Sequence, residues 1–159
     1  MISTQEIYAR LEKMGLSLPK AAAPAANYVP YVISGQQVYI SGQLPFLDGQ
    51  QSHIGRLGDT LTLESGAEAA QNCALNILAQ LDVAMGGDWS RLKRCVKLGG
   101  FVNSTPQFTD QPAVINGASN LMGELLGEMG RHARFAVSAA SLPFGVAVEI
   151  DAVFEIKPN

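Results

Sequence analysis

The spacing of apolar residues changes along the chain between the period of a helix and the period of a strand. Residues 63–85 repeat apolar side chains every three or four positions, which predicts a long helix with one buried face. Residues 146–156 instead alternate apolar and polar positions, and Glu149, Asp151 and Glu155 share the polar side. This alternation is typical of a strand that buries one face.

Cap and turn residues place the remaining elements. Ser3 and Glu6 have the spacing of a capping box and open a predicted short helix over residues 4–14. Pro112 is expected in the first turn of a second long helix that runs to about Met129. The other predicted strands are 31–34 and 37–41, joined by the two-residue turn Gly35-Gln36, together with 93–103 and 134–140.

This order of elements predicts an α+β fold with an α/β layer, in which two long helices back a mixed β-sheet. The length of 159 residues fits a single domain. Residues 1–27 are expected to form an N-terminal helix and loop extension, and residues 28–157 the core. Residues 21–47 carry no charge, but their prolines and glycines indicate loop and strand, so no membrane span is expected.

Charge and composition narrow the classes of function. The net charge is -3 and the isoelectric point is about 5.3, so the chain has no global basic field for nucleic acid. An anionic ligand must therefore meet a local arginine or lysine. Cys73 and Cys95 have no metal-binding spacing and are expected to be buried and reduced, which together with the lack of a signal peptide indicates the cytoplasm.

Common cofactor and metal motifs are missing from the sequence. There is no Walker A motif, no G-x-G-x-x-G after a strand, no H-E-x-x-H and no C-x-x-C. The two histidines, His53 and His132, fall in predicted loops, and no metal site can be built from them. We therefore expect neither a cofactor nor a metal.

An arginine and a carboxylate remain as candidates for chemistry. Arg134 begins an otherwise apolar strand, and a buried guanidinium needs a partner. That partner is either Glu149 or Asp151 on the neighbouring strand, in a structural ion pair, or the carboxylate of a substrate, which arginine binds with two parallel hydrogen bonds. Glu149 is either an ordinary exposed strand residue or a partly desolvated carboxylate that orients a water molecule.

Several segments resemble the RidA/YjgF family of imine deaminases. Residues 134–143, followed by 148–152, are similar to the C-terminal signature of that family. Earlier matches are Pro30-Tyr31-Val32, the turn at residues 40–45, the strand at residues 96–102, and Asn116. These segments span about 120 residues in the order that the family shows, which is more specific than a single motif.

The resemblance implies a chorismate-mutase-like fold, assembled as a homotrimer with ligand clefts between subunits. It implies hydrolysis of 2-enamino or 2-imino acids to 2-keto acids and ammonia. Arg134 would hold the substrate carboxylate and Glu149 would place the water. The residues that would complete the cleft are Tyr31, Ser41, Gly42 and Asn116.

Two departures and two other functions accompany this resemblance. Ala136 stands where many compact members have a cysteine, which alters the cleft wall, and the N-terminal helix is additional. One alternative is a non-catalytic trimer that binds a small carboxylate or keto acid. The other is an endoribonuclease or translation inhibitor, which the acidic isoelectric point disfavours.

Overall fold

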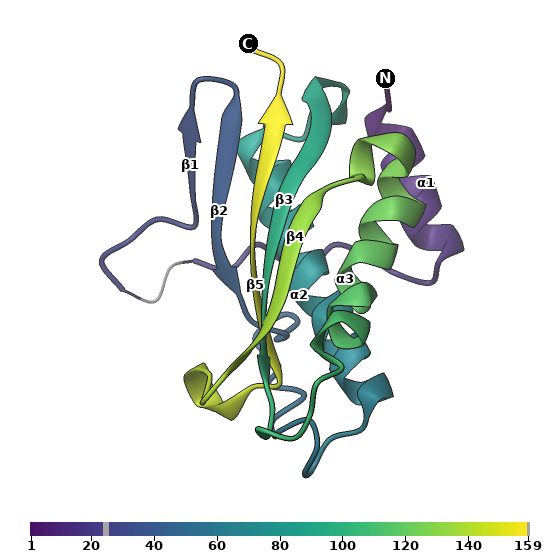
Figure 1. Cartoon of the computed structure of the whole chain (residues 1–159). Helices are drawn as coiled ribbons and strands as arrows, with labels where there is room; N and C mark the ends of the chain where they lie inside the picture. The colour runs from purple at the N-terminus through teal and green to yellow at the C-terminus, as the bar shows by residue number, and fades with distance from the viewer. Residues whose placement is uncertain (24–25, 159) are drawn as a thin grey trace.

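The computed structural model describes residues 1–23 and 26–158, and it confirms the expected α+β architecture (Figure 1). Pro24, which falls in the loop of the expected N-terminal extension, lies outside the described residues. The helices are α1 (Thr4–Lys13), α2 (Leu63–Ala84) and α3 (Gln111–Leu126). The strands are β1 (Tyr31–Ser34), β2 (Gln37–Gln43), β3 (Leu92–Asn103), β4 (Ala133–Ala139) and β5 (Val148–Ile156).

The five strands form one mixed sheet in the order β1-β2-β5-β3-β4. The β3–β4 pair is parallel, and the other pairs are antiparallel. Figure 1 shows α2 and α3 on one face of this sheet, with α1 beside α3. The order corrects one expectation from the sequence: the strand of Arg134 is not the neighbour of the strand of Glu149, because β3 lies between them.

Small residues let α2 pack closely against both α3 and the sheet. Gly117 of α3 lies against the backbone carbonyl of Ala67 in α2, where a β-carbon would overlap the oxygen. Cys73 and Ala74 are fully buried on α2, so small side chains bring this helix close to the sheet. The long apolar helix expected from the sequence is therefore confirmed, and it is buried on most sides.

The second long helix ends three residues earlier than expected. Gly127 adopts a φ of 61°, a conformation that ends α3, and a 3₁₀ turn over Gly127–Gly130 follows. The spacing of apolar residues continues through Met129, so periodicity alone did not show this change.

Among the described residues, no helix covers the other face of the sheet. Alternation along β5 buries Val148, Ile150 and Ala152 under the helices, as expected. On the uncovered face, apolar side chains are 40–51% exposed. They are Val32, Tyr39, Phe101 and Val137.

Candidate functional site

Arg134 lies on the helix-covered face of the sheet, at the edge formed by β4. It pairs in register with the buried Leu98 of β3. Its Nη1 donates a hydrogen bond to Oγ of Ser119 at 3.1 Å, and its Nη2 donates to the carbonyl of Pro112 at 3.2 Å. Within residues 1–23 and 26–158 it forms no ion pair, so the structural ion pair with Glu149 or Asp151 is wrong for this chain.

Asn116 is brought to the same place as Arg134. Both residues line a shallow hollow of about 480 Å³ between α3 and the start of β4. The guanidinium uses two of its five N–H donors on neutral acceptors, which leaves three for a ligand. The hollow therefore presents an arginine whose positive charge is not neutralised by any carboxylate of the described residues.

Glu149 lies on the opposite, uncovered face. It pairs in register with Phe101, three residues after Leu98 on β3, and side chains at odd separations along a strand point to opposite faces. Glu149, Phe101, Asp151 and Gly42 line a hollow of about 230 Å³. Burial raises the pKa of Glu149, and the nearby charge of Asp151 raises it further.

A bulge in β2 places Gly42 beside this carboxylate. The register between β2 and β5 shifts between Ile40 and Gln43, so Ser41 and Gly42 leave the regular ladder. The hydroxyl of Ser41 donates a hydrogen bond to the carbonyl of Val29 at 2.8 Å, and its amide donates one to the carbonyl of Pro30. Gly42 is thus the residue that contacts Glu149, while Ser41 holds the turn in place.

Tyr31 is separate from both hollows. It pairs in register with the buried Ile40 and packs, half-buried, against the hydrophobic core. Its strand, β1, forms the edge of the sheet opposite to β4. Within one chain, the structure therefore joins Arg134 with Asn116 and Gly42 with Glu149, and it does not join these pairs or bring Tyr31 to them.

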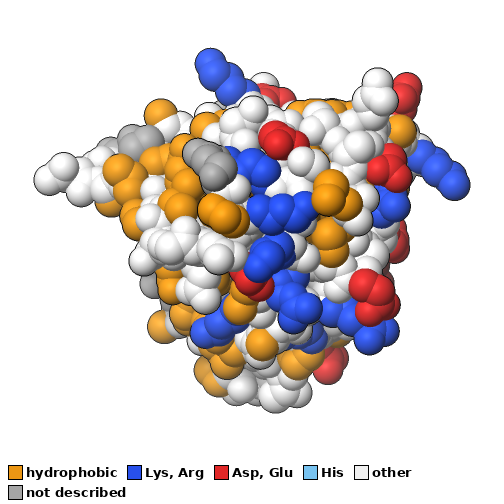
Figure 2. All heavy atoms as spheres, turned by 90° about the horizontal axis from the view of Figure 1, so that it is seen from above, with side chains coloured by type: hydrophobic (Ala, Val, Ile, Leu, Met, Phe, Trp, Pro, Cys, Tyr) orange, Lys and Arg blue, Asp and Glu red, His pale blue; other side chains and the backbone are white. Residues whose placement is uncertain are grey.

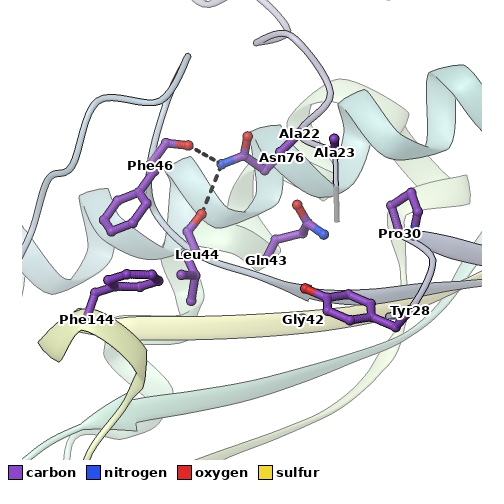
Figure 3. Close-up of a pocket in the computed structure, with 10 residues that line it drawn as sticks. All are labelled: Ala22, Ala23, Tyr28, Pro30, Gly42, Gln43, Leu44, Phe46, Asn76 and Phe144. Atoms are coloured by element: carbon purple, nitrogen blue, oxygen red, sulfur yellow. Dashed lines mark hydrogen bonds between the residues drawn. The ribbon is translucent and has the colours of Figure 1, made fainter. Parts of the chain in front are cut away.

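A further pocket was not foreseen from the sequence. It measures about 250 Å³, and Gly42 lines this pocket as well as the hollow of Glu149. In Figure 3 the rings of Phe46 and Phe144 lie at one end and Tyr28 at the other. The other lining residues are Ala22, Ala23, Pro30, Gln43, Leu44 and Asn76.

One polar residue in α2 could have indicated this pocket. Asn76 lies in an otherwise apolar stretch of the helix and is 6% exposed, and a buried amide must find hydrogen-bond partners. Its Nδ2 donates to the carbonyls of Leu44 at 2.9 Å and Phe46 at 2.6 Å (Figure 3). Asn76 thereby fixes the loop that forms one wall of the pocket.

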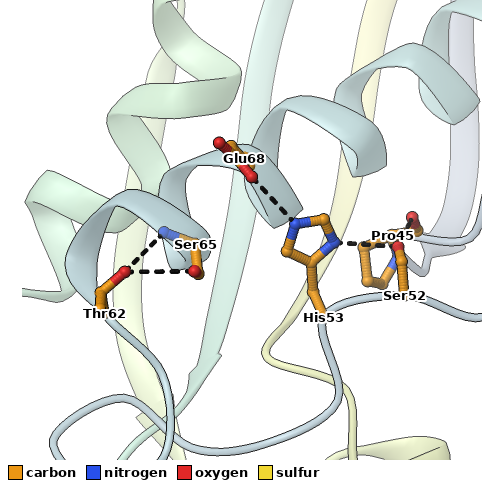
Figure 4. Close-up of polar contacts among 6 residues, drawn as sticks. All are labelled: Pro45, Ser52, His53, Thr62, Ser65 and Glu68. Carbon is orange, nitrogen blue, oxygen red and sulfur yellow. Dashed lines mark hydrogen bonds and ion pairs between the residues drawn. The ribbon is translucent and has the colours of Figure 1, made fainter.

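The loop before α2 is tied to that helix by a histidine. The imidazole of His53 lies 3.4 Å from Glu68 of α2 through Nε2 and 2.9 Å from Oγ of Ser52 through Nδ1 (Figure 4). Thr62 caps α2 by accepting a hydrogen bond from the amide of Ser65.

Across residues 1–23 and 26–158, no three His, Cys, Asp or Glu side chains gather as a metal site would require.

Basic residues gather on one end of the molecule although the net charge is negative. Figure 2 shows Lys and Arg side chains together on the end seen from above. Lys93, Arg94 and Lys157 line a hollow of about 440 Å³ there, and Glu155 pairs with Lys93 at 2.8 Å. This local patch is a feature that the overall composition did not reveal.

Known proteins place the chain in a family. Residues 8–154 match a family described as YjgF/chorismate mutase-like. The same description names its members, provisionally, as endoribonucleases. The chain belongs to this family, which is the one that its sequence motifs resemble. Protein TCP17 of Trypanosoma cruzi is 50% identical over 99% of this chain and 98% of its own length.

Two solved structures are similar along nearly the whole chain. The protein Atu1372 of Agrobacterium tumefaciens, described as of unknown function, is 51% identical, with a TM-score of 0.92 over 97% of this chain and 94% of its own. A protein from Shewanella oneidensis, described provisionally as an endoribonuclease, is 35% identical, with a TM-score of 0.90 over 97% of this chain and 99% of its own. Each of these two structures therefore matches nearly all of the chain.

No helix within the part of the chain that the structure describes combines the length and the apolar character needed to cross a membrane.

Proposed function

We propose that this protein hydrolyses 2-enamino or 2-imino acids to 2-keto acids and ammonia. One observation carries the proposal: among the described residues, Arg134 has no carboxylate partner, and Glu149, whose pKa is raised, lies on the opposite face of the same sheet. The arginine suits the carboxylate of a small substrate, and the carboxylate suits a water molecule. The sequence motifs that resemble the RidA/YjgF imine deaminases support the same reaction.

The proposed reaction needs only positioning and one proton carrier. Arg134 binds the substrate carboxylate, and Glu149 takes a proton from water as the oxygen attacks the imine carbon. Glu149 passes this proton to the nitrogen of the tetrahedral adduct, then takes the remaining hydroxyl proton and delivers it to the same nitrogen as the carbon–nitrogen bond breaks and the carbonyl forms. Water and imino acid thus become keto acid and ammonia, with no redox change and no step that requires a metal or cofactor.

A complete site would take two copies of the chain. Arg134 and Glu149 cannot meet within one copy, because the sheet separates them. We propose a homotrimer in which Arg134 and Asn116 of one copy face Gly42 and Glu149 of the next. The uncovered sheet face supports this assembly, since large exposed apolar patches mark association surfaces. We place the protein in the cytoplasm, where its two unbridged cysteines would stay reduced.

Mixing two inactive variants tests the proposal. The substrate 2-aminoacrylate is generated from serine by a PLP-dependent lyase, and release of ammonia and pyruvate is measured. Arg134→Ala and Glu149→Gln are each expected to lose at least about 100-fold of the rate. When the two are co-expressed, about one quarter of the clefts would contain both native residues, so activity should return in part.

The outcomes of this experiment separate two parts of the proposal. No rate above background for the unaltered protein would overturn the deaminase function. A 2-keto acid that binds by calorimetry without turnover of the imine would then favour a non-catalytic binding protein. Activity without recovery in the mixture would instead overturn the shared site. Arg94→Ala, an exposed arginine on β3, serves as the control and should retain full activity.

The basic patch favours a second candidate, cleavage of RNA. Lys93, Arg94 and Lys157 gather at one end, and such patches attract polyanions. If RNA is a substrate, metal-free purified protein should cleave it, and replacing Lys93 and Arg94 with alanine should abolish cleavage without affecting deamination. Intact RNA after prolonged incubation would exclude this candidate.

A further inference from the structure

The hydroxyl of Ser119 lies between an imidazole and the guanidinium of Arg134. Its Oγ is 2.9 Å from Nε2 of His132 and 3.1 Å from Nη1 of Arg134. On the other side of the imidazole ring, Nδ1 of His132 lies 2.6 Å from the carbonyl oxygen of Gly130. Four groups from α3, the loop before β4, and β4 itself therefore form one continuous chain of hydrogen bonds.

The order of donors in this chain follows from its fixed end. A backbone carbonyl only accepts, so Nδ1 of His132 carries a proton. In the neutral imidazole Nε2 is then an acceptor, and the hydroxyl of Ser119 donates to it. The oxygen of Ser119 consequently turns its lone pairs toward Arg134, whose Nη1 donates. With a neutral imidazole, every donor in this series of hydrogen bonds has an acceptor, so the direction of each bond follows.

A glycine brings the loop close enough for this chain to form. Gly130 packs against the backbone carbonyl of Met122 on α3, where a β-carbon would overlap the oxygen. This close approach places the residues after Gly130 beside α3, so that His132 reaches Ser119 on that helix. The loop and α3 are therefore packed together beside the start of β4.

We infer that Ser119 and His132 are positioning residues that hold the Arg134 guanidinium in the orientation that receives the substrate carboxylate. The inference rests on the proposed function and adds two residues to it. Ser119 sets the rotation of the guanidinium together with the Pro112 carbonyl, and His132 acts only through Ser119. A hydrogen bond to a charged group that fixes its direction improves recognition of a planar, bidentate partner.

The test compares KM and kcat in variants of the full chain. Ser119→Ala is expected to raise KM about tenfold, a loss of ~1.4 kcal/mol in binding, with kcat within about twofold of the native value. Ser119→Thr keeps the hydroxyl and should restore KM to within about threefold. Asn120→Ala, the exposed neighbour on α3, is the control and should leave both constants unchanged. Calorimetry with 2-oxobutanoate gives the same comparison as a dissociation constant, without turnover.

Coupling between the two residues gives the sharper result. His132→Ala is expected to raise KM about threefold, and the double variant with Ser119→Ala should match Ser119→Ala alone, because His132 has no other route to Arg134. Additive effects, or a KM for Ser119→Ala equal to the native one, would overturn the inference while native activity still upheld the proposed function. Nitrogen NMR of the imidazole should show the proton on Nδ1; a proton on Nε2 alone would contradict the assigned direction.

Discussion

The backbone of Gly42 lies directly against the carboxylate of Glu149. A β-carbon at position 42 would overlap Oε1 and lie 3.1 Å from Cδ of the same side chain. The bulge in β2 creates this contact, because it moves residue 42 out of the ladder and over β5. The space available to Glu149 is thus set by the absence of a side chain on the neighbouring strand.

Gly42→Ala should therefore damage activity without unfolding the protein. The methyl group meets the end of a flexible side chain, so Glu149 can rotate away at little structural cost. A displaced base loses its place beside the water, and we expect kcat to fall about 100-fold. Thermal unfolding followed by circular dichroism should show a nearly unchanged Tm. A large fall in Tm would show that position 42 supports the fold.

Glu149→Gln should make the protein more stable at neutral pH, although it is expected to remove activity. Because burial raises the pKa of Glu149 in the folded protein, its contribution to stability is fully present below the ordinary glutamate pKa. That contribution is lost as pH rises through the raised value, where the folded protein must hold a partly buried charge. The glutamine variant avoids this loss. Its Tm should exceed that of the native protein at pH 7, and the difference should vanish toward pH 3. A lower Tm at pH 7 would show that ionised Glu149 is stabilised by a partner copy.

Two glycines on α3 should respond in opposite ways to alanine. Gly117→Ala places a methyl group on the backbone carbonyl of Ala67, so α2 and α3 must separate; we expect a loss of about 3 kcal/mol in the free energy of unfolding. Gly123 has open space around its β-position and is exposed. Gly123→Ala should stabilise the protein by about 0.5–1 kcal/mol. Urea denaturation measures both, and equal effects would contradict the tight packing of the two helices.

The two cysteines should be inert in the folded protein. Burial raises the pKa of Cys95 to about 12 and that of Cys73 well above its ordinary value, so neither forms appreciable thiolate at pH 8. Ellman's reagent should label neither thiol until urea is added, and then both. Rapid labelling under native conditions would show that α2 or β3 opens locally.

Local patterns in the sequence predicted the elements more closely than their arrangement. Alternation along residues 146–156 placed Glu149 on the correct, more open face of its strand, because successive side chains of a strand point to opposite faces. The order of strands is a property of the whole sheet. Arg134 and Glu149 lie on consecutive strands in sequence, yet β3, which precedes both, inserts between them. Periodicity contains no information on that insertion.

The candidate site shows the same limit. The resemblance to the YjgF family named six residues, and the structure places four of them in two separate hollows. Ser119 and His132 were not singled out, since a serine within a helix and a histidine in a loop carry no motif. Their contact depends on the approach of Gly130 to Met122, which only the folded chain defines.

The sheet gives the backbones of the two halves of the proposed site unequal support. Glu149 lies on β5, which is hydrogen-bonded to strands on both sides. Arg134 lies on β4, an edge strand with one ladder and one free side. An edge strand can shift or fray at a lower cost in free energy than a central strand. The half proposed to bind the substrate carboxylate can therefore adjust its position with β4, while the half proposed to place the water is fixed by the strands on either side of β5.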